Sequence, residues 1–324
     1  MSYAFLAKAL LALASVATIF PAAAQTWPEK PSRIVLAGGP GTLPDVIVRV
    51  TADHLSRAFA RPFVVENLVG GAGLLAPQAV ARAAPDGYTY FFGGVGFIAS
   101  DKYMFKTPGY DADREFVPVA LLYDSAPFVI AVHPDLPVKS VPELIALAKA
   151  QPGKLSYGAD TIGATALAGP WFTKVAGVDI VSVPYKSIAQ MISDSVAGTT
   201  NMVVNSFANI ESFRRAGKLR VIGITSSERS PALKEVPAVA ESLPGFKIVG
   251  VGILAAPAGT PVAIVQRVNR EIDVLVKQPE YVQRLLNVGI TSSGAGTAQS
   301  IAQFIRSERE IWDRIMKGMN VQPQ

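Results

Sequence analysis

The sequence predicts an α/β protein of two lobes, each a sheet flanked by helices. Short apolar strands alternate with amphipathic helices along the chain, a pattern typical of parallel sheets covered on both faces. The chain has 324 residues, and single hydrophobic cores stop growing at about 250 to 300 residues. Half of its residues are hydrophobic and 17% are charged, and its 27 Gly and 24 Pro are spread throughout. This composition indicates a globular, turn-rich protein.

The first strand of the chain runs into a glycine loop and then into a helix. Thr42 is the expected N-cap, with Asp45 three residues later and Pro44 inside the first turn, where no N–H is needed. Unpaired N–H groups of a first turn, together with the helix dipole, favour a bound carboxylate or phosphate by ~0.3–2 kcal/mol. The alternative interpretation is an ordinary tight strand-to-helix connection.

The later elements continue the alternation. Strands are expected at 63–66, 88–92, 127–132, 155–157, 180–183, 202–204, 219–225 and 248–255, and helices from 74, at 144–150, before Gly177, at 187–197, 208–216 and 260–276, from 279, and at 298–317. Two extended crossings, near 123–128 and 246–251, are expected to act as a pair of hinges. The first lobe is therefore expected at 25–125 and again at 249–324, with the second lobe at 126–248.

A second loop repeats the pattern of the first. Small residues from Gly158 to Thr165 follow a short strand and precede a helix, which predicts a second anion cradle. Lys186 follows Pro184-Tyr185 at another strand end. It either pairs with a ligand carboxylate or is a solvated lysine.

The first 24 residues have the pattern of a signal peptide. Lys8 precedes the apolar run Ala9 to Phe20, and Ala22-Ala23-Ala24 forms a cleavage site before Gln25. No later segment has the ~18 uninterrupted apolar residues of a transmembrane helix, and the chain has no cysteine. We therefore expect a soluble protein without disulfides, exported to the bacterial periplasm, whose mature chain begins near Gln25.

The charge pattern argues against nucleic acid as a partner. The net charge is +5, and Lys and Arg are scattered singly among acids, without a basic block or interleaved aromatics. We expect no cofactor either. The run Gly71-x-Gly73-x-x-Ala76 fits a loose dinucleotide fingerprint, but the nearest acid downstream, Asp86, lies in a Pro-Asp-Gly turn and misses the ribose contact.

Catalytic and metal-binding residues are not expected. The chain has no G-x-S-x-G elbow, and its only histidines are His54 and His133. Neither has partners at the spacing that nucleophilic catalysis or a metal site requires, so we interpret both as structural or surface residues. An enzyme is therefore the least favoured functional class.

Several different short motifs are distributed along the whole mature chain. They are Trp27-Pro28, Pro40-Gly41 with Asp45, Val65-Glu66-Asn67 with Gly70 and Gly73, Pro85-Asp86-Gly87-Tyr88-Thr89, Tyr110-Asp111 with Phe116-Val117-Pro118-Val119, the segments Ala148 to Gly158 and Val183 to Lys186, Ala216 to Arg220, and Ala256 to Pro261. In order and spacing they resemble the periplasmic solute receptors of tripartite tricarboxylate transporters, often called Bug-type binding proteins.

This resemblance implies a periplasmic-binding-protein fold of type II that closes on one small carboxylate and delivers it to a two-component membrane permease. We expect a monomer. In similar proteins, loop N–H groups and ordered water bind the carboxylate oxygens. By position, and with Lys186 added, the expected ligand-binding residues are Pro40, Gly41, Thr42, Leu43, Asp45 and Gly70 in the first lobe and Asp160, Thr161, Ile162, Gly163, Ala164, Thr165, Lys186, Asn205, Ser206 and Phe207 in the second.

Departures from the family pattern bear on the ligand. Thr42 stands where a second glycine is usual, and Ala159 and Ala164 stand where serines are usual, with no histidine following. A hydroxyl-rich acid such as citrate would leave polar groups unpaired at ~1–3 kcal/mol each. We therefore expect a flatter and more apolar ligand, an aromatic mono- or dicarboxylate, on which Phe207 either stacks or is core packing.

A ligand-binding sensor is the second functional class. It would have the same receptor fold, but its closed state would contact a signalling protein instead of a permease. The residues do not separate these two classes.

Overall fold

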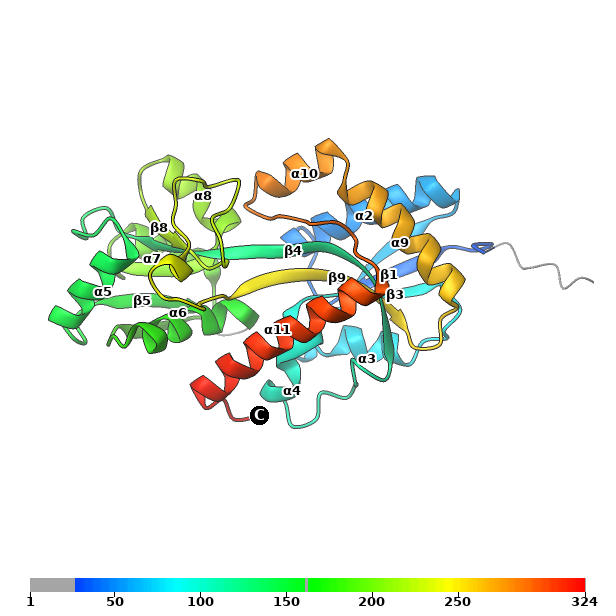
Figure 1. The fold of residues 1–324 in the computed structure, drawn as a ribbon, viewed down its shortest axis with the longest axis horizontal. Helices are drawn as coiled ribbons and strands as arrows, with labels where there is room; N and C mark the ends of the chain where they lie inside the picture. Colours follow the sequence, from blue (N-terminus) through cyan, green and yellow to red (C-terminus); the bar gives the residue numbers. More distant parts are fainter. Residues whose placement is uncertain (1–26, 161–162, 324) are drawn as a thin grey trace, which may run out of the picture.

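The computed structural model describes residues 27–160 and 163–323. The predicted signal peptide at 1–24 lies outside these residues, as do Thr161 and Ile162 of the second predicted loop. Two lobes lie side by side, and two long strands, β4 (Phe116–Val132) and β9 (Val249–Pro257), run between them (Figure 1). In the described part of the chain, no helix is long and apolar enough to cross a membrane.

The first lobe is a sheet with helices on both faces. Its other elements are β1 (Ser32–Leu36), β2 (Phe63–Asn67), β3 (Thr89–Gly93), α2 (Leu43–Phe59), η1 (Gly71–Gly73), α3 (Leu75–Ala81), η2 (Gly96–Ser100), α4 (Asp101–Met104), α9 (Val262–Val276) and α10 (Pro279–Leu286). The strand order is β2-β1-β3-β9-β4. β1 is parallel to β2 and β3, whereas β9 is antiparallel to β3 and β4.

The two faces of this sheet belong to different cores. Ile34 and Leu36 of β1 share a core with α2 and α9, whereas Val35 shares one with α3 on the opposite face. This alternation follows from the two-residue period of a strand. A strand buried on both faces is expected to be a continuous apolar run, as Ile34 to Leu36 is.

The second lobe repeats the arrangement. Its other elements are β5 (Ser156–Asp160), β6 (Val181–Tyr185), β7 (Met202–Ser206), β8 (Arg220–Ile224), α5 (Val141–Ala150), α6 (Gly163–Ala176), α7 (Ile188–Val196), α8 (Phe207–Arg215) and η3 (Val239–Glu241). The order β4-β7-β5-β6 has β5 parallel to both neighbours and β7 antiparallel to β4. β8 pairs separately with β4.

The parallel strands of each lobe run toward the other lobe. In the first lobe, Gly93 at the end of β3 pairs with Ile253 of β9. In the second lobe, Ser206 at the end of β7 pairs with Phe128 of β4. Both pairings lie on the side of the lobe that faces its partner, because β4 and β9 connect the two. The loops after β1 to β3 and after β5 to β7 therefore face the region between the lobes, where open α/β sheets bind ligands.

Every predicted strand and helix overlaps an observed one. One extent was wrong: a strand was predicted only from Pro127, whereas β4 begins at Phe116. Its first part pairs with β9, and the pairing shifts register after Pro118, after Leu121 and after Tyr123. Such irregularities accommodate a proline and bend a strand. They also interrupt the local pattern from which the strand could have been read.

The last helix, α11 (Ala298–Met319), touches both lobes. It packs along η2 of the first lobe, where the Arg309 guanidinium donates to the Ile98 carbonyl oxygen at 2.6 Å. Near its C-terminal end, Gly318 lies against Trp171 of α6 in the second lobe, so closely that a Cβ there would be 2.6 Å from the ring. Figure 1 shows α11 running from the first lobe toward α6.

Candidate functional site

The loop between β1 and α2 begins the candidate site. Thr42 is the N-cap residue of α2, but the predicted side-chain cap is wrong: its hydroxyl donates to the Gly39 carbonyl oxygen at 2.7 Å and accepts no N–H of the helix. Among the described residues, the N–H groups of Leu43 and Asp45 in the first turn have no acceptor. The helix therefore keeps open donors at its N-terminus.

Asp45 is buried behind this loop and fully hydrogen-bonded. Its side chain is 2% exposed. One carboxylate oxygen accepts from the Gly41 N–H at 2.9 Å and from the Arg49 Nε at 2.9 Å. The other accepts from Arg49 at 3.0 Å and from the Asn67 amide at 2.8 Å. The bond to Arg49, with those to Asn67 and Gly41, holds the pKa of Asp45 at about 2. Asp45 is thus a paired carboxylate that shapes the loop.

A cavity of about 270 Å³ lies at the carboxyl ends of β1 and β3 and reaches the crossing strands; we call it the crossing cavity. Ala37, Gly38 and Pro44 line the cavity. The predicted loop residues Pro40, Gly41 and Thr42 are exposed and do not line it. The lining residues are Leu36, Ala37, Gly38, Pro44, Ala72, Gly73, Pro77, Phe91, Phe92, Gly93, Gly94, Gly96, Phe97, Asp101, Tyr123 and Val251.

Most residues that line this cavity were not predicted from the sequence as ligand-binding residues. The run Gly93-Gly94-Val95-Gly96 after β3 is a third glycine-rich strand end, and that signal could have been read from the sequence. Tyr123 and Val251 come from β4 and β9, and only the pairing of those strands brings them to the cavity. Gly70 was predicted at the site, but it lies against Leu75, where a Cβ would be 2.9 Å from Cδ1. Its neighbours Ala72 and Gly73 line the cavity instead.

Four aromatic rings are part of the lining of the crossing cavity. Phe92 and Tyr123 have ring centroids 6.3 Å apart, and Phe91 and Phe97 meet edge to face at 4.9 Å. The Tyr123 ring covers Gly252, where a Cβ would be 2.3 Å from the ring. Burial raises the pKa of Tyr123, so its hydroxyl keeps its proton at neutral pH. Among the described residues that hydroxyl has no hydrogen-bond partner.

The second predicted loop is described only in part. Thr165 donates from its hydroxyl to the Asp160 carboxylate at 2.8 Å, which joins the end of β5 to the first turns of α6. Gly163 begins α6, and Ala164 follows it half-buried. Asp160 also pairs in register with Tyr185 of β6, so Lys186 lies exposed at the next strand end. No acid of the described residues forms an ion pair with Lys186.

The third predicted loop turns two of its side chains inward. The Asn205 side chain is 1% exposed and accepts from Asn209 of α8 at 2.7 Å. Phe207 is 3% exposed in a core of the second lobe and lies against Gly289, where a Cβ would be 2.6 Å from the ring. Phe207 therefore packs in this core. Ser206, the half-buried N-cap residue of α8, makes no side-chain cap bond.

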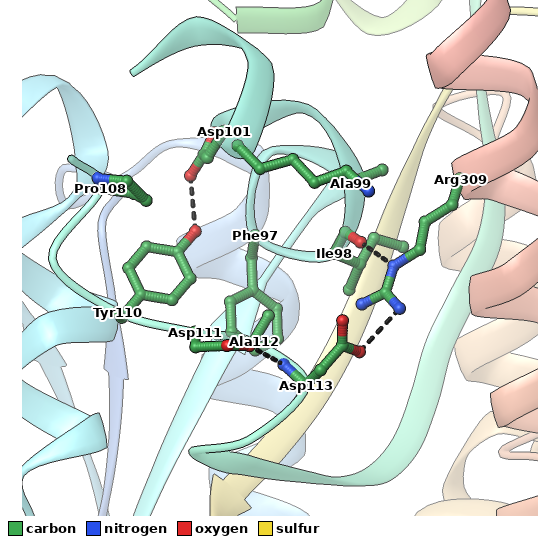
Figure 2. A pocket seen from close by; sticks show the side chains of 11 residues that line it. Phe97, Ile98, Ala99, Asp101, Pro108, Tyr110, Asp111, Ala112, Asp113 and Arg309 are labelled. Atoms are coloured by element: carbon green, nitrogen blue, oxygen red, sulfur yellow. Dashed lines mark hydrogen bonds and ion pairs between the residues drawn. The ribbon is translucent and has the colours of Figure 1, made fainter. Parts of the chain in front are cut away.

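A second hollow, of about 280 Å³, lies between η2, the segment 108–113 and α11 (Figure 2). Its polar groups bind one another. Tyr110 donates to the Asp101 carboxylate at 2.7 Å, and Arg309 forms an ion pair with Asp113 at 2.7 Å. Burial raises the pKa of Asp101, although the Tyr110 bond opposes the shift.

Neither histidine lies in the crossing cavity. His54 of α2 is 9% exposed, with its Nε2 3.6 Å from the Glu271 carboxylate of α9. His133 follows β4, with its Nδ1 3.7 Å from Asp135. Within the described ranges, no three potential metal ligands of the His, Cys, Asp or Glu type gather in one place.

Two lobes joined by paired crossing strands, with strand-end loops facing the space between them, define a solute-binding protein of the periplasmic type. The model of the family described as "Tripartite tricarboxylate transporter family receptor" matches residues 47–321. The chain belongs to this family, whose members are periplasmic receptors.

Individual relatives cover nearly the whole chain. A protein encoded in the tcbD-tcbE intergenic region of Pseudomonas sp. (strain P51) is 32% identical over 293 residues, 90% of this chain and 86% of the relative. An R. palustris protein solved with adipate has a TM-score of 0.80 and 29% identity, over 92% of this chain and all of that one. MatC from Rhodopseudomonas palustris, solved with bound malate, has a TM-score of 0.74 and 26% identity, over 89% and 99%.

Proposed function

We propose that this receptor captures a small carboxylate between its lobes and delivers it to a two-component membrane permease. The observation that carries the proposal is the N-terminus of α2. The N–H groups of Leu43 and Asp45 have no acceptor among the described residues, and they lie at a strand end that faces the other lobe. The nearby Asp45 charge is balanced by Arg49. A carboxylate satisfies such donors, and the helix dipole adds to the attraction.

The walls of the crossing cavity support an acid with an apolar body. The lining includes four aromatic residues, and one of them, Tyr123, offers a hydroxyl; the four are Phe91, Phe92, Phe97 and Tyr123. Rings pack edge to face or offset on aromatic ligands, with ~0.5–1.5 kcal/mol beyond burial alone. We therefore propose an aromatic mono- or dicarboxylate. The relatives solved with adipate and malate make the aliphatic diacids the competing ligands.

Capture follows from closure of the lobes. The loop at 41–45 belongs to the first lobe and the loop at 160–165 to the second, and a ligand between them would bridge the two. The hinge is β4 with β9, whose pairing shifts register on both sides of Tyr123. Lys186, exposed beside the second loop, adds a positive charge to that side. The mature receptor acts as a monomer after the leader at 1–24 is removed.

A thermal-shift screen of residues 25–324 tests the proposal. A ligand at about 100 times its Kd stabilises the folded state by ~2.7 kcal/mol, which raises the melting temperature measurably. The panel contains benzoate, phthalate, adipate, malate and citrate. A shift with benzoate or phthalate supports the aromatic preference, and a shift with adipate or malate alone replaces it with an aliphatic one. No shift with any acid contradicts carboxylate capture.

The variant Thr42→Glu tests whether the ligand carboxylate binds at the N-terminus of α2. A carboxylate at position 42, beside the first turn of α2, would repel an anion there, so we expect loss of binding for any acid found in the screen. Thr199→Glu is the matched control, because Thr199 is exposed in the turn before β7, at the opposite end of that strand. Normal binding by Thr42→Glu would show that the carboxylate binds elsewhere.

A further inference from the structure

Three side chains form a network behind the loop at 37–42, and Asn67 is at its centre. Asn67 ends β2 and pairs in register with Leu36 of β1. Its amide nitrogen donates to the Gly38 carbonyl oxygen at 2.8 Å and to the Asp45 carboxylate at 2.8 Å. Its amide oxygen accepts from Arg49 at 3.1 Å. The side chain thus links the loop to the paired carboxylate.

The bond to Gly38 sets the direction of the next N–H. In a trans peptide the C=O and the following N–H point to opposite sides. Because Asn67 holds the Gly38 carbonyl inward, the Gly39 N–H points away from the network. A Cβ at Gly39 would meet nothing within 4 Å, so the Gly39 Cα borders open space. The Gly39 N–H has no acceptor among the described residues.

The same network removes a donor that the sequence suggested. The Gly41 N–H is bound to the Asp45 carboxylate at 2.9 Å, so it is not available to a ligand. The open donors are therefore the Gly39 N–H together with the first turn of α2. Which N–H groups are open decides where an anion could bind. This depends on contacts with Asn67 and Asp45 and cannot be read from one residue of the loop.

We propose that Asn67 is a positioning residue that aims the Gly39 N–H at the ligand carboxylate. This inference rests on the proposed carboxylate capture. The sheet does not need the Asn67 side chain, since a backbone bond from the Leu68 N–H to the Leu36 carbonyl oxygen, 2.9 Å long, holds β2 to β1 at this point. Removal of the side chain should release the loop and leave the strands paired.

The first test uses the unliganded protein. Residual dipolar couplings report the direction of the Gly39 N–H in wild type, in Asn67→Ala and in the milder Asn67→Ser, which serves if the alanine variant does not fold. Glu66→Ala is the matched control, because Glu66 is the neighbouring residue and pairs outward with Arg33. We expect the Gly39 coupling to change in the Asn67 variants and to stay constant in Glu66→Ala. An unchanged coupling in both Asn67 variants would overturn the positioning role.

The second test adds ligand. The wild type is titrated with benzoate and with adipate while its amide chemical shifts are recorded. We expect the Gly39 amide resonance to move. Binding of the better of the two acids should weaken about 10-fold or more in the Asn67 variants, as expected for one hydrogen bond to a charged group. An affinity that does not change would contradict the inference. A wild type that binds neither acid contradicts the proposed function, whereas the dipolar couplings still decide whether Asn67 directs the loop.

Discussion

Asp45 and Asp101 are carboxyl groups of the first lobe whose pKa values shift in opposite directions. Arg49, Asn67 and the Gly41 N–H all donate to Asp45, and together they outweigh its burial and lower its pKa to about 2. Burial raises the pKa of Asp101, and the hydrogen bond from the Tyr110 hydroxyl opposes this shift without outweighing it. The number of donors around a buried carboxylate therefore decides which form the fold favours.

The Asp45 network predicts a stability difference in acid. A carboxyl whose folded pKa lies below its unfolded value stabilises the fold at higher pH and loses that contribution as the pH falls toward the folded pKa. The window here runs from about pH 4 to about pH 2. Urea unfolding across this range should show a steeper loss of stability in the wild type than in Asp45→Asn. Asp135→Asn, at a side chain 92% exposed, is the control, and equal slopes in wild type and Asp45→Asn would contradict the network.

At the scale of elements, the crossing of β4 and β9 joins the lobes and lines the crossing cavity. The pairing shifts register between Leu121 and Tyr123 and again between Tyr123 and Ala126, opposite the run Gly250-Val251-Gly252. The Tyr123 ring lies on Gly252 because glycine has no side chain to displace it. A segment without regular pairing can change its dihedral angles at lower cost than a regular ladder, as a hinge requires.

The two glycines of this run provide a matched pair of substitutions. Gly252→Ala puts a Cβ 2.3 Å from the Tyr123 ring, whereas Gly250→Ala makes an ordinary contact of 3.4 Å with Ala126. Overpacking costs about 1–3 kcal/mol, so Gly252→Ala should lower the free energy of unfolding by that amount and Gly250→Ala by clearly less. Denaturant unfolding measures both. Similar losses in the two variants would show that the Tyr123 ring is not seated on Gly252.

At the scale of the whole molecule, α11 connects the two lobes and the crossing. Arg309 contacts η2 in the first lobe, and Gly318 lies against Trp171 in the second. Next to Arg309 in the chain, Glu308 is 1% exposed and pairs with Lys247, in the segment that leads into β9. One helix is therefore in contact with both lobes and with the segment that leads into β9.

This ion pair predicts a large effect from one substitution in α11. Glu308→Ala leaves the Lys247 ammonium without its buried partner, and breaking a buried pair costs about 3–5 kcal/mol. Lys247 is 24% exposed, which favours the lower end of that range. Glu310→Ala, at an exposed glutamate of the same helix, should change stability by less than about 0.5 kcal/mol. Equal unfolding free energies for the two variants would show that the pair does not stabilise the molecule.

The sequence by itself determined the positions of most strands and helices and the family, because apolar periodicity, turn residues and motif spacing are local properties. It located the first loop for the same reason. The tertiary structure decided which groups of that loop are open: Asp45 binds the Gly41 N–H, Thr42 bonds to Gly39 instead of capping α2, and Asn67 reaches the loop from a neighbouring strand. It also brought Tyr123 to the crossing cavity and turned Phe207 into the core. These outcomes depend on contacts between residues far apart in the chain, which no local pattern records.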